Sequence, residues 1–208
     1  MEVLEKIITI EEHSEVKMKE KGSVFIGKVF HIETETEASE ILEKLRKEYY
    51  DATHCCYAYK AHSPNITKYS DDGEPNGTAG VRIMGAIEKH SLTNVLVAVI
   101  RYFGGVKLGV GPLGKAYADS AAAVLENSKR IEKFAYYLGE VSFDFNFSGN
   151  IHRLLSNYGA KILETKFADV PSISFYLPVR HKEKFISEVT EITRGKAGIE
   201  ILPEVFFL

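Results

Sequence analysis

The sequence predicts an α+β fold made of two domains, and three observations indicate it. Strand-like alternation and helical stripes of apolar residues follow one another along the 208 residues. The apolar spacing changes near Glu132, which separates residues 1–131 from residues 132–208. The second stretch has the predicted order β-α-β-β-α-β, which is the order of a ferredoxin-like domain.

The first part of the N-terminal domain is expected to form two strands and a helix. Ile8 and Ile10 alternate with polar neighbours, and residues 24–30 are rich in β-branched and aromatic side chains, as strands are. A helix follows, because apolar residues recur there at spacings of three and four. These residues are Ala38, Ile41, Leu42, Leu45 and Tyr49. Thr34 or Thr36 is expected to cap the start of this helix.

The rest of this domain is expected to form two strands, two loops and two helices. Residues 53–59 have the pattern of a strand, and the apolar run 95–100 that of a strand buried on both faces. A polar loop at 62–80 precedes a short helix, and a glycine-rich loop at 104–114 precedes a third helix. The short helix buries Ile83, Met84 and Ile87. The third helix buries Leu113, Tyr117, Ser120, Ala121 and Val124.

The C-terminal domain opens with a predicted strand of alternating apolar residues. These are Val141, Phe143, Phe145 and Phe147. Ser148 is expected to cap the helix that follows, and Gly159 is expected to end it. Strands are predicted at 161–167, 173–179 and 199–207, and a helix lies between the last two. The apolar residues of that helix are Phe185, Ile186, Val189 and Ile192.

Composition and charge limit the function. The net charge is −3, and neither predicted domain has an excess of Lys and Arg, so a strong nonspecific nucleic-acid binder is not expected. The two cysteines, Cys55 and Cys56, are adjacent, which does not fit a secreted disulfide framework. The sequence shows neither a signal-peptide pattern at its start nor an apolar stretch of membrane-spanning length. We therefore expect a cytoplasmic protein without membrane contact.

Residues 70–80 hold the densest group of carboxylates and turn-forming residues. The candidate functional residues of this acidic loop are Asp71, Asp72, Gly73, Glu74, Gly77 and Thr78. Carboxylates on a loop can bind Mg²⁺ or Ca²⁺, although their spacing here is not that of an EF-hand. The same residue types also favour tight turns. Both interpretations stay open at this point, and we assign no metal ligand.

The glycine-rich segment that follows residues 95–100 is the candidate RNA- or phosphate-binding site. Its residues are Arg101, Tyr102, Phe103, Gly104, Gly105, Lys107, Gly109, Gly111 and Lys115. Two nucleotide-binding motifs nearly match. However, the G-x-G-x-x-G glycines do not directly follow a strand, and Ala116 replaces the Ser or Thr of a P-loop. A glycine loop that enters a helix presents free N–H groups to phosphate, and aromatic rings can stack on unpaired bases. The alternative is that the aromatic residues are core and the glycines allow close packing.

His54 and Cys56 fall on one face of the strand predicted at 53–59, so a Cys/His dyad is geometrically allowed. A buried cysteine beside a structural histidine is the more common arrangement. Zinc sites usually use separated ligand pairs, which two adjacent cysteines do not supply. We assign no catalytic residue and no cofactor.

The sequence contains ATHCCYAY at residues 52–59, SDDGEPNGTAG at 70–80 and LTNVLVAVIRYFGGVKLGVGPLGKAY at 92–117. These stretches closely resemble the signature of the IMPACT family, in its bacterial YigZ branch. The resemblance covers residues 15–130, and residues 131–208 look like the C-terminal domain of YigZ proteins. It implies an N-terminal domain similar to the second domain of a small-subunit ribosomal protein. It also implies a C-terminal ferredoxin-like domain similar to one in elongation factor G.

The chain departs from the family pattern around the glycine loop. Pro112 stands where the family usually has glycine, and Lys115 where it usually has arginine. A lysine binds phosphate as a point charge and lacks the fork of an arginine. One basic residue is also lost near Lys21. These changes weaken a basic surface without removing it.

The resemblance implies a role in translation, because both fold relatives work on the ribosome. Eukaryotic family members regulate translation through protein–protein contacts. The sequence therefore predicts a non-catalytic binding protein that contacts RNA or the ribosome through its glycine-rich loop. Two alternatives remain, a protein-binding translational regulator and a metal-dependent enzyme that uses the acidic loop. The sequence leaves the oligomeric state open.

Overall fold

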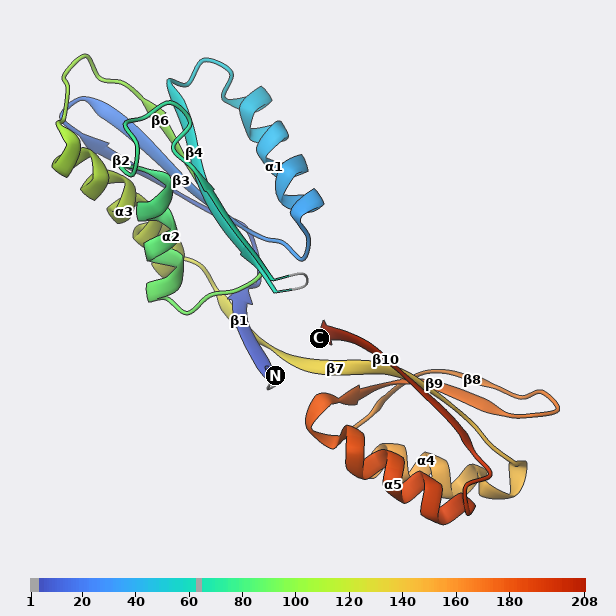
Figure 1. The fold of residues 1–208 in the computed structure, drawn as a ribbon. Helices are drawn as coiled ribbons and strands as arrows, with labels where there is room; N and C mark the ends of the chain where they lie inside the picture. Colours follow the sequence, from blue (N-terminus) through green and yellow to red (C-terminus); the bar gives the residue numbers. More distant parts are fainter. Residues whose placement is uncertain (1–3, 63–64) are drawn as a thin grey trace. The chain divides into compact units, whose positions relative to one another are not determined.

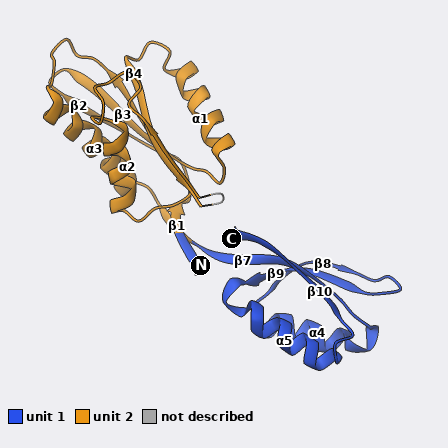
Figure 2. Ribbon diagram, viewed as in Figure 1, with its two compact units in different colours: residues 1–7, 133–208 blue, residues 8–132 orange. Residues whose placement is uncertain are grey.

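The computed structural model describes residues 4–62 and 65–208, so two residues of the predicted polar loop and the first three residues lie outside the description. The chain forms two compact units (Figure 2). The N-terminal unit comprises residues 8–132, and the C-terminal unit comprises residues 4–7 and 133–208. The assignment of residues 1–131 and 132–208 as separate folding domains stays a prediction, which thermal unfolding can test.

The N-terminal unit is a five-stranded antiparallel sheet with helices on both faces. Its strands, in spatial order, are β2 (Ser14–Glu20), β3 (Ser23–His31), β6 (Val95–Tyr102), β4 (His54–Ala61) and β5 (Ile66–Ser70). Helix α1 (Glu35–Glu48) covers one face. Helices α2 (Gly80–Lys89) and α3 (Val110–Glu126) cover the other (Figure 1).

Strand β6 divides the two hydrophobic cores of this unit, because its side chains alternate between the faces. Val95, Val97 and Val99 pack in the core of α2 and α3. The intervening residues Leu96, Ala98 and Ile100 pack in the core of α1. All six are fully buried, as the continuous apolar run predicts. Such a central strand is a rigid support for the loop that follows it.

Three elements of this unit differ from the sequence-based expectation. Strands β2 and β5 were missed, because both are edge strands whose side chains are mostly exposed and polar. The third helix begins at Val110, so the predicted glycine loop ends earlier than residue 114. Pro112 fits inside this first turn, because the N–H groups there have no helical partner to lose.

Thr34 caps α1 as predicted, since its hydroxyl accepts a hydrogen bond from the N–H of Glu37.

The C-terminal unit has the predicted β-α-β-β-α-β order. Its elements are β7 (Arg130–Ser142), α4 (Ser148–Asn157), β8 (Lys161–Lys166), β9 (Ser172–Pro178), α5 (Lys182–Thr193) and β10 (Gly198–Phe207). The strands lie in the order β10-β7-β9-β8, and β1 (Lys6–Ile10) also pairs with β7. Helices α4 and α5 cover one face of this sheet (Figure 1). No helix in the described part of the chain is long and apolar enough to cross a membrane.

Two boundaries in this unit correct the sequence prediction. The predicted alternation from Val141 to Phe147 is wrong beyond Ser142, where β7 ends. Residues 145–147 form a 3₁₀ turn (η1), because the Asp144 carboxylate accepts a hydrogen bond from the N–H of Asn146. Ser148 is the first residue of α4 and does not cap it. A local side-chain bond therefore outweighs the apolar alternation at this point.

Candidate functional site

The acidic loop and the glycine loop meet at one end of the N-terminal unit through a buried ion pair. Arg101, near the end of β6, donates from Nη1 to Oε1 of Glu74 at 2.5 Å. The hydroxyl of Tyr117 on α3 donates to the same oxygen at 2.7 Å. The Arg101 and Glu74 side chains are only 6% and 4% exposed. Two loops that are distant in sequence are therefore joined by one carboxylate.

Arg101 lies among rings and hydroxyls, away from solvent. Its guanidinium carbon is 5.4 Å from the ring centre of Phe25 and 5.6 Å from that of Phe103. Nη2 donates to the Ser23 hydroxyl at 3.4 Å. Nε is buried and has no hydrogen-bond partner among the described residues. Arg101, which the sequence places among the phosphate-binding candidates, is therefore buried in the interior of the N-terminal unit.

Asp71 organises the start of helix α2. Ala79, at the N-cap, has no side-chain oxygen to offer. Asp71 supplies it from the preceding loop, because its carboxylate accepts from the N–H groups of Gly77, Ala79 and Gly80 at 2.8–2.9 Å. Burial works to raise the pKa of this carboxyl, but the three N–H donors outweigh burial and lower the pKa below its ordinary value.

The other two carboxylates of the acidic loop point to separate partners. Asp72, at φ +42°, accepts through Oδ2 from the N–H of Cys55 at 2.6 Å, and Arg46 lies 3.6 Å from its Oδ1. Glu74 faces Arg101. In the described ranges, no group of three His, Cys, Asp or Glu side chains has an arrangement that could hold a metal ion. Each of the three carboxylates of this loop has protein partners of its own.

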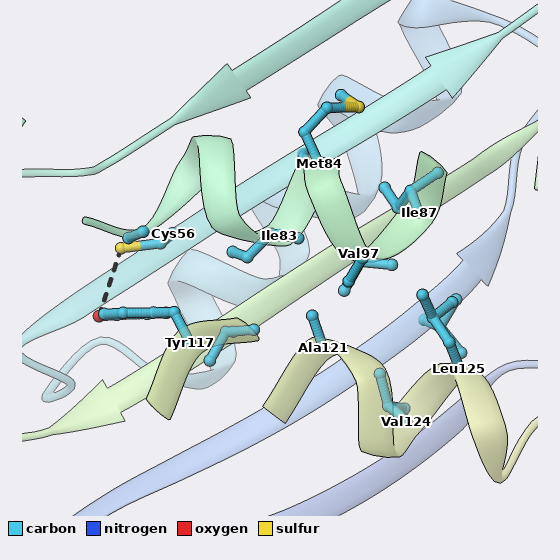
Figure 3. Close-up of a cluster of buried hydrophobic side chains, with 14 of the residues drawn as sticks. Cys56, Ile83, Met84, Ile87, Val97, Tyr117, Ala121, Val124 and Leu125 are labelled. Carbon is cyan, nitrogen blue, oxygen red and sulfur yellow. Dashed lines mark hydrogen bonds between the residues drawn. The ribbon is translucent and has the colours of Figure 1, made fainter. Parts of the chain in front are cut away.

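Cys56 lies beneath these loops, at one end of the core cluster (Figure 3). Its thiol donates to the carbonyl oxygen of Asp71 at 3.0 Å and lies 3.4 Å from the Tyr117 hydroxyl. Burial raises the pKa of Cys55 to about 11 and that of Cys56 still further. Both thiols are thus protonated at neutral pH. The His54 ring faces Asp72 and Glu74, whereas the hydrogen-bond partners of the Cys56 thiol are Asp71 and Tyr117.

The glycines of the second loop serve backbone geometry. A Cβ added at Gly104 would lie 1.9 Å from the carbonyl carbon of Gly22, so the β2–β3 turn and this loop touch through their backbones. The Gly104 N–H donates to the Ser23 hydroxyl at 3.1 Å. Gly105 and Gly109 have positive φ angles of 84° and 85°. The loop is therefore shaped by its own backbone and by the neighbouring turn.

An exposed rim surrounds this buried polar cluster. Phe103, Val106 and Val110 are 45%, 54% and 68% exposed. Lys107 is exposed and has no ion-pair partner within the described ranges, whereas Lys115 pairs with Asp119 one turn along α3. Of the three predicted basic residues, Arg101 is therefore buried and Lys115 is paired. Lys107 is exposed and has no ion-pair partner among the residues that the structure describes.

Three further residues belong to this end of the unit, although the sequence did not indicate them as site residues. Ser23 and Tyr117 bind the Arg101–Glu74 pair, and Lys21 is exposed beside the Gly22–Gly104 contact. Tyr117 was predicted only as a core residue of its helix. Arg101 and Tyr117 share the stretch 92–117, but no spacing pattern in the sequence indicates that these side chains meet Glu74 and Ser23.

The fold and the site define an α+β protein of two units, in which one unit carries a buried polar cluster under an exposed glycine loop. Residues 21–125 match the Impact N-terminal domain family, and residues 141–196 match DUF1949, a domain of unknown function. The chain belongs to the IMPACT family, as its motifs predict.

Individual relatives extend over nearly the whole chain. The IMPACT family member YvyE of Bacillus subtilis (strain 168) is 32% identical over 199 residues, which cover 95% of this chain and 92% of that protein. The IMPACT family member YigZ of Escherichia coli (strain K12) is 27% identical over 187 residues, covering 88% and 92%. A solved structure, described as that of a hypothetical protein, covers 97% of this chain and 100% of its own. It has a TM-score of 0.71 at 26% identity.

Proposed function

We propose that this protein is a non-catalytic binding protein of the translation apparatus that contacts RNA or the ribosome through the exposed rim of its glycine loop. The observation that carries the proposal is the exposure of Phe103 and Lys107 on a loop braced from below by the Arg101–Glu74 pair. An aromatic ring can stack on an unpaired base while a cation contacts the backbone phosphate. The link to translation comes from the family resemblance.

The loop also offers a rigid frame for such contacts. The Gly104 backbone lies against Gly22, and its N–H is held by Ser23. This contact places exposed Lys21, the residue before Gly22, next to the loop that carries Lys107. Binding to a preformed loop loses less conformational entropy than binding to one that must order. The proposal therefore assigns recognition to the exposed side chains of the loop and its neighbouring turn, and stability to the polar cluster below them.

The buried groups favour a binding role over a catalytic one. The carboxylate of Asp71 is occupied by three N–H donors, and that of Glu74 by Arg101 and Tyr117. The thiol of Cys56 has a raised pKa, because it is buried. A general base or nucleophile needs reach to a substrate and a pKa near the working pH. These groups instead tie the loops to the core.

The test is equilibrium binding of a single-stranded oligouridine and of purified ribosomal subunits across a salt series. We expect Lys21→Ala/Lys107→Ala to weaken binding. The slope of log K against log salt concentration should become less negative by about 1.4, at about 0.7 per phosphate contact on a single strand. Phe103→Ala should weaken binding without changing this slope, because stacking releases no counterion.

The matched control is Lys44→Ala/Lys47→Ala on α1, which removes the same charge from the other face of the sheet. An equal loss of affinity in this control would mean that only net charge matters. Such a result, or no binding of either probe at low salt, would overturn the proposal.

A protein partner is the second candidate function, favoured by the apolar part of the rim. Val106 and Val110 are more exposed than Phe103, and valine offers no stacking surface to a base. If the loop binds a protein, Val106→Ser/Val110→Ser should abolish recovery of a specific partner from host lysate and leave oligouridine binding unchanged. Equal recovery by the wild type and the variant would exclude this use of the loop.

A further inference from the structure

The sheet of the C-terminal unit has one face that no helix of that unit covers (Figure 1). Helices α4 and α5 pack on the side where Val141 and Phe175 point. Strand alternation places the neighbouring side chains on the opposite face. These are Tyr136, Leu138 and Glu140 on β7, Ser174 and Tyr176 on β9, and Glu200 and Phe206 on β10. They form what we call the open face.

A row of aromatic rings crosses three strands of the open face. Tyr136 and Tyr176 have ring centres 6.5 Å apart, and Tyr176 and Phe206 have ring centres 5.5 Å apart. Lys161 on β8 lies with its Nζ 4.6 Å from the ring centre of Tyr136. All three rings are half-buried. The row is therefore an aromatic surface that is partly accessible.

A hollow of about 220 Å³ lies on the same face. It is lined by Leu138, Gly139, Glu140, Ser174, Glu200 and Leu202. Glu140 and Glu200 are directly opposite each other across β7 and β10, an arrangement of like charges that destabilises a sheet. The Ser174 hydroxyl donates to Glu140 at 3.1 Å, but no Lys, Arg or His of the described residues forms an ion pair with either carboxylate.

The hollow has the size and chemistry of a receptor for one long basic side chain. It is smaller than a small-molecule pocket, which typically measures about 300–1,000 Å³. Leu138 and Leu202 can pack against the methylene stem of a Lys or Arg, while Glu140 and Glu200 bind its charged head. A bound cation would also relieve the repulsion between the two carboxylates.

We propose that the open face is a docking surface for a protein segment that carries an arginine or lysine next to an aromatic or large apolar residue. The basic side chain enters the hollow, and its apolar neighbour packs on the row Tyr136–Tyr176–Phe206. Charge complementarity selects this occupant. A sheet of this layout can also stack RNA bases on its aromatic residues. Here, however, the phosphates would face Glu140 and Glu200. Of the two lysines near the row, Lys161 lies over the Tyr136 ring and Lys166 already pairs with Glu164.

The experiment is a titration of the full chain with the dipeptide acetyl-Arg-Phe-amide, followed by amide NMR. We expect the chemical-shift changes to be concentrated at the open-face positions of β7, β9 and β10. The matched dipeptide acetyl-Glu-Phe-amide should produce none there. Glu140→Gln/Glu200→Gln should weaken acetyl-Arg-Phe-amide binding about fivefold, since an accessible ion pair contributes up to about 1 kcal/mol.

The control variant is Glu183→Gln/Glu191→Gln, which removes the same charge from α5, on the covered side. Equal weakening by this variant, or no shifts with the arginine dipeptide, would overturn the proposal. Two other occupants would also overturn it. Oligouridine that shifts the same amide signals more strongly would identify an RNA surface. Shifts that depend on protein concentration alone would identify a second copy of the chain.

Discussion

Burial decides the role of individual residues in the acidic and glycine loops. Arg101, Lys107 and Lys115 form one basic group in the sequence, but only Lys107 is both exposed and free of an ion pair within the described residues. Removing one partner of a buried pair costs about 3–5 kcal/mol, because the other charge is left uncompensated. A loss of binding in an Arg101 variant would therefore be hard to distinguish from unfolding. A substitution at Lys107 therefore tests binding without this ambiguity.

Asp71 gives a prediction at the same scale. Its two oxygens serve three N–H groups, so Asp71→Asn must turn an amide NH₂ toward one of these donors. We expect the free energy of unfolding to fall by about 1–2 kcal/mol at pH 7, since hydrogen bonds to charged groups contribute about 1.5–3 kcal/mol. The measurement is urea unfolding followed by circular dichroism.

The pH dependence of this effect has a definite sign. The pKa of Asp71 is lower in the folded state than in the unfolded chain, because the N–H donors outweigh burial. Its contribution is thus complete above about pH 4 and is lost as the pH falls through the lower folded value. The gap between wild type and Asp71→Asn should narrow below about pH 4. A gap that is constant with pH would contradict this assignment, and Asp169→Asn, in the exposed β8–β9 connection, is the control.

At the scale of elements, glycines of one motif have different structural roles. Gly104 is required by the backbone of Gly22, whereas Gly111 is inside helix α3 with open space where a Cβ would stand. The spacing of glycines in the sequence does not distinguish these cases. It resembles two nucleotide-binding motifs, although α3 begins at Val110 and so includes Gly111 in its first turn.

This difference predicts opposite effects of the same substitution. Gly104→Ala should destabilise the N-terminal unit by about 1–3 kcal/mol, the usual cost of overpacking, because its Cβ would collide with the β2–β3 turn. Gly111→Ala should raise stability by up to about 1 kcal/mol, because alanine favours the helix. Chemical unfolding of the two variants beside the wild type checks both signs. Equal destabilisation by both would refute the packing argument.

At the scale of the whole molecule, the chain is built from two units with separate cores. The apolar clusters of residues 8–132 share no member with the cluster around Phe175 and Phe185. Separate cores allow two units to unfold independently, and a single core does not. The proposed functions follow the same division, with the glycine loop on one unit and the open face on the other.

Calorimetry tests this division. Phe185 is fully buried and packs on Phe175 and Tyr158, so Phe185→Ala should destabilise the C-terminal unit by about 3–5 kcal/mol. We expect two thermal transitions in the wild type, of which only one moves down in the variant. Circular dichroism at a temperature between the two transitions should show residual structure. A single transition that shifts as a whole would mean that the two units fold as one.

The amino-acid sequence by itself determined the fold class, the family and the long elements, because apolar periodicity is a local property. The run 95–100 is one example, since its composition is enough to predict a strand buried on both faces. The edge strands β2 and β5 escaped because exposed strands need no apolar alternation. Only the tertiary structure decided that Arg101 binds Glu74 and Tyr117, and that Glu140 lies opposite Glu200. Such pairings depend on which segments meet when the chain packs, and no spacing along the chain encodes them.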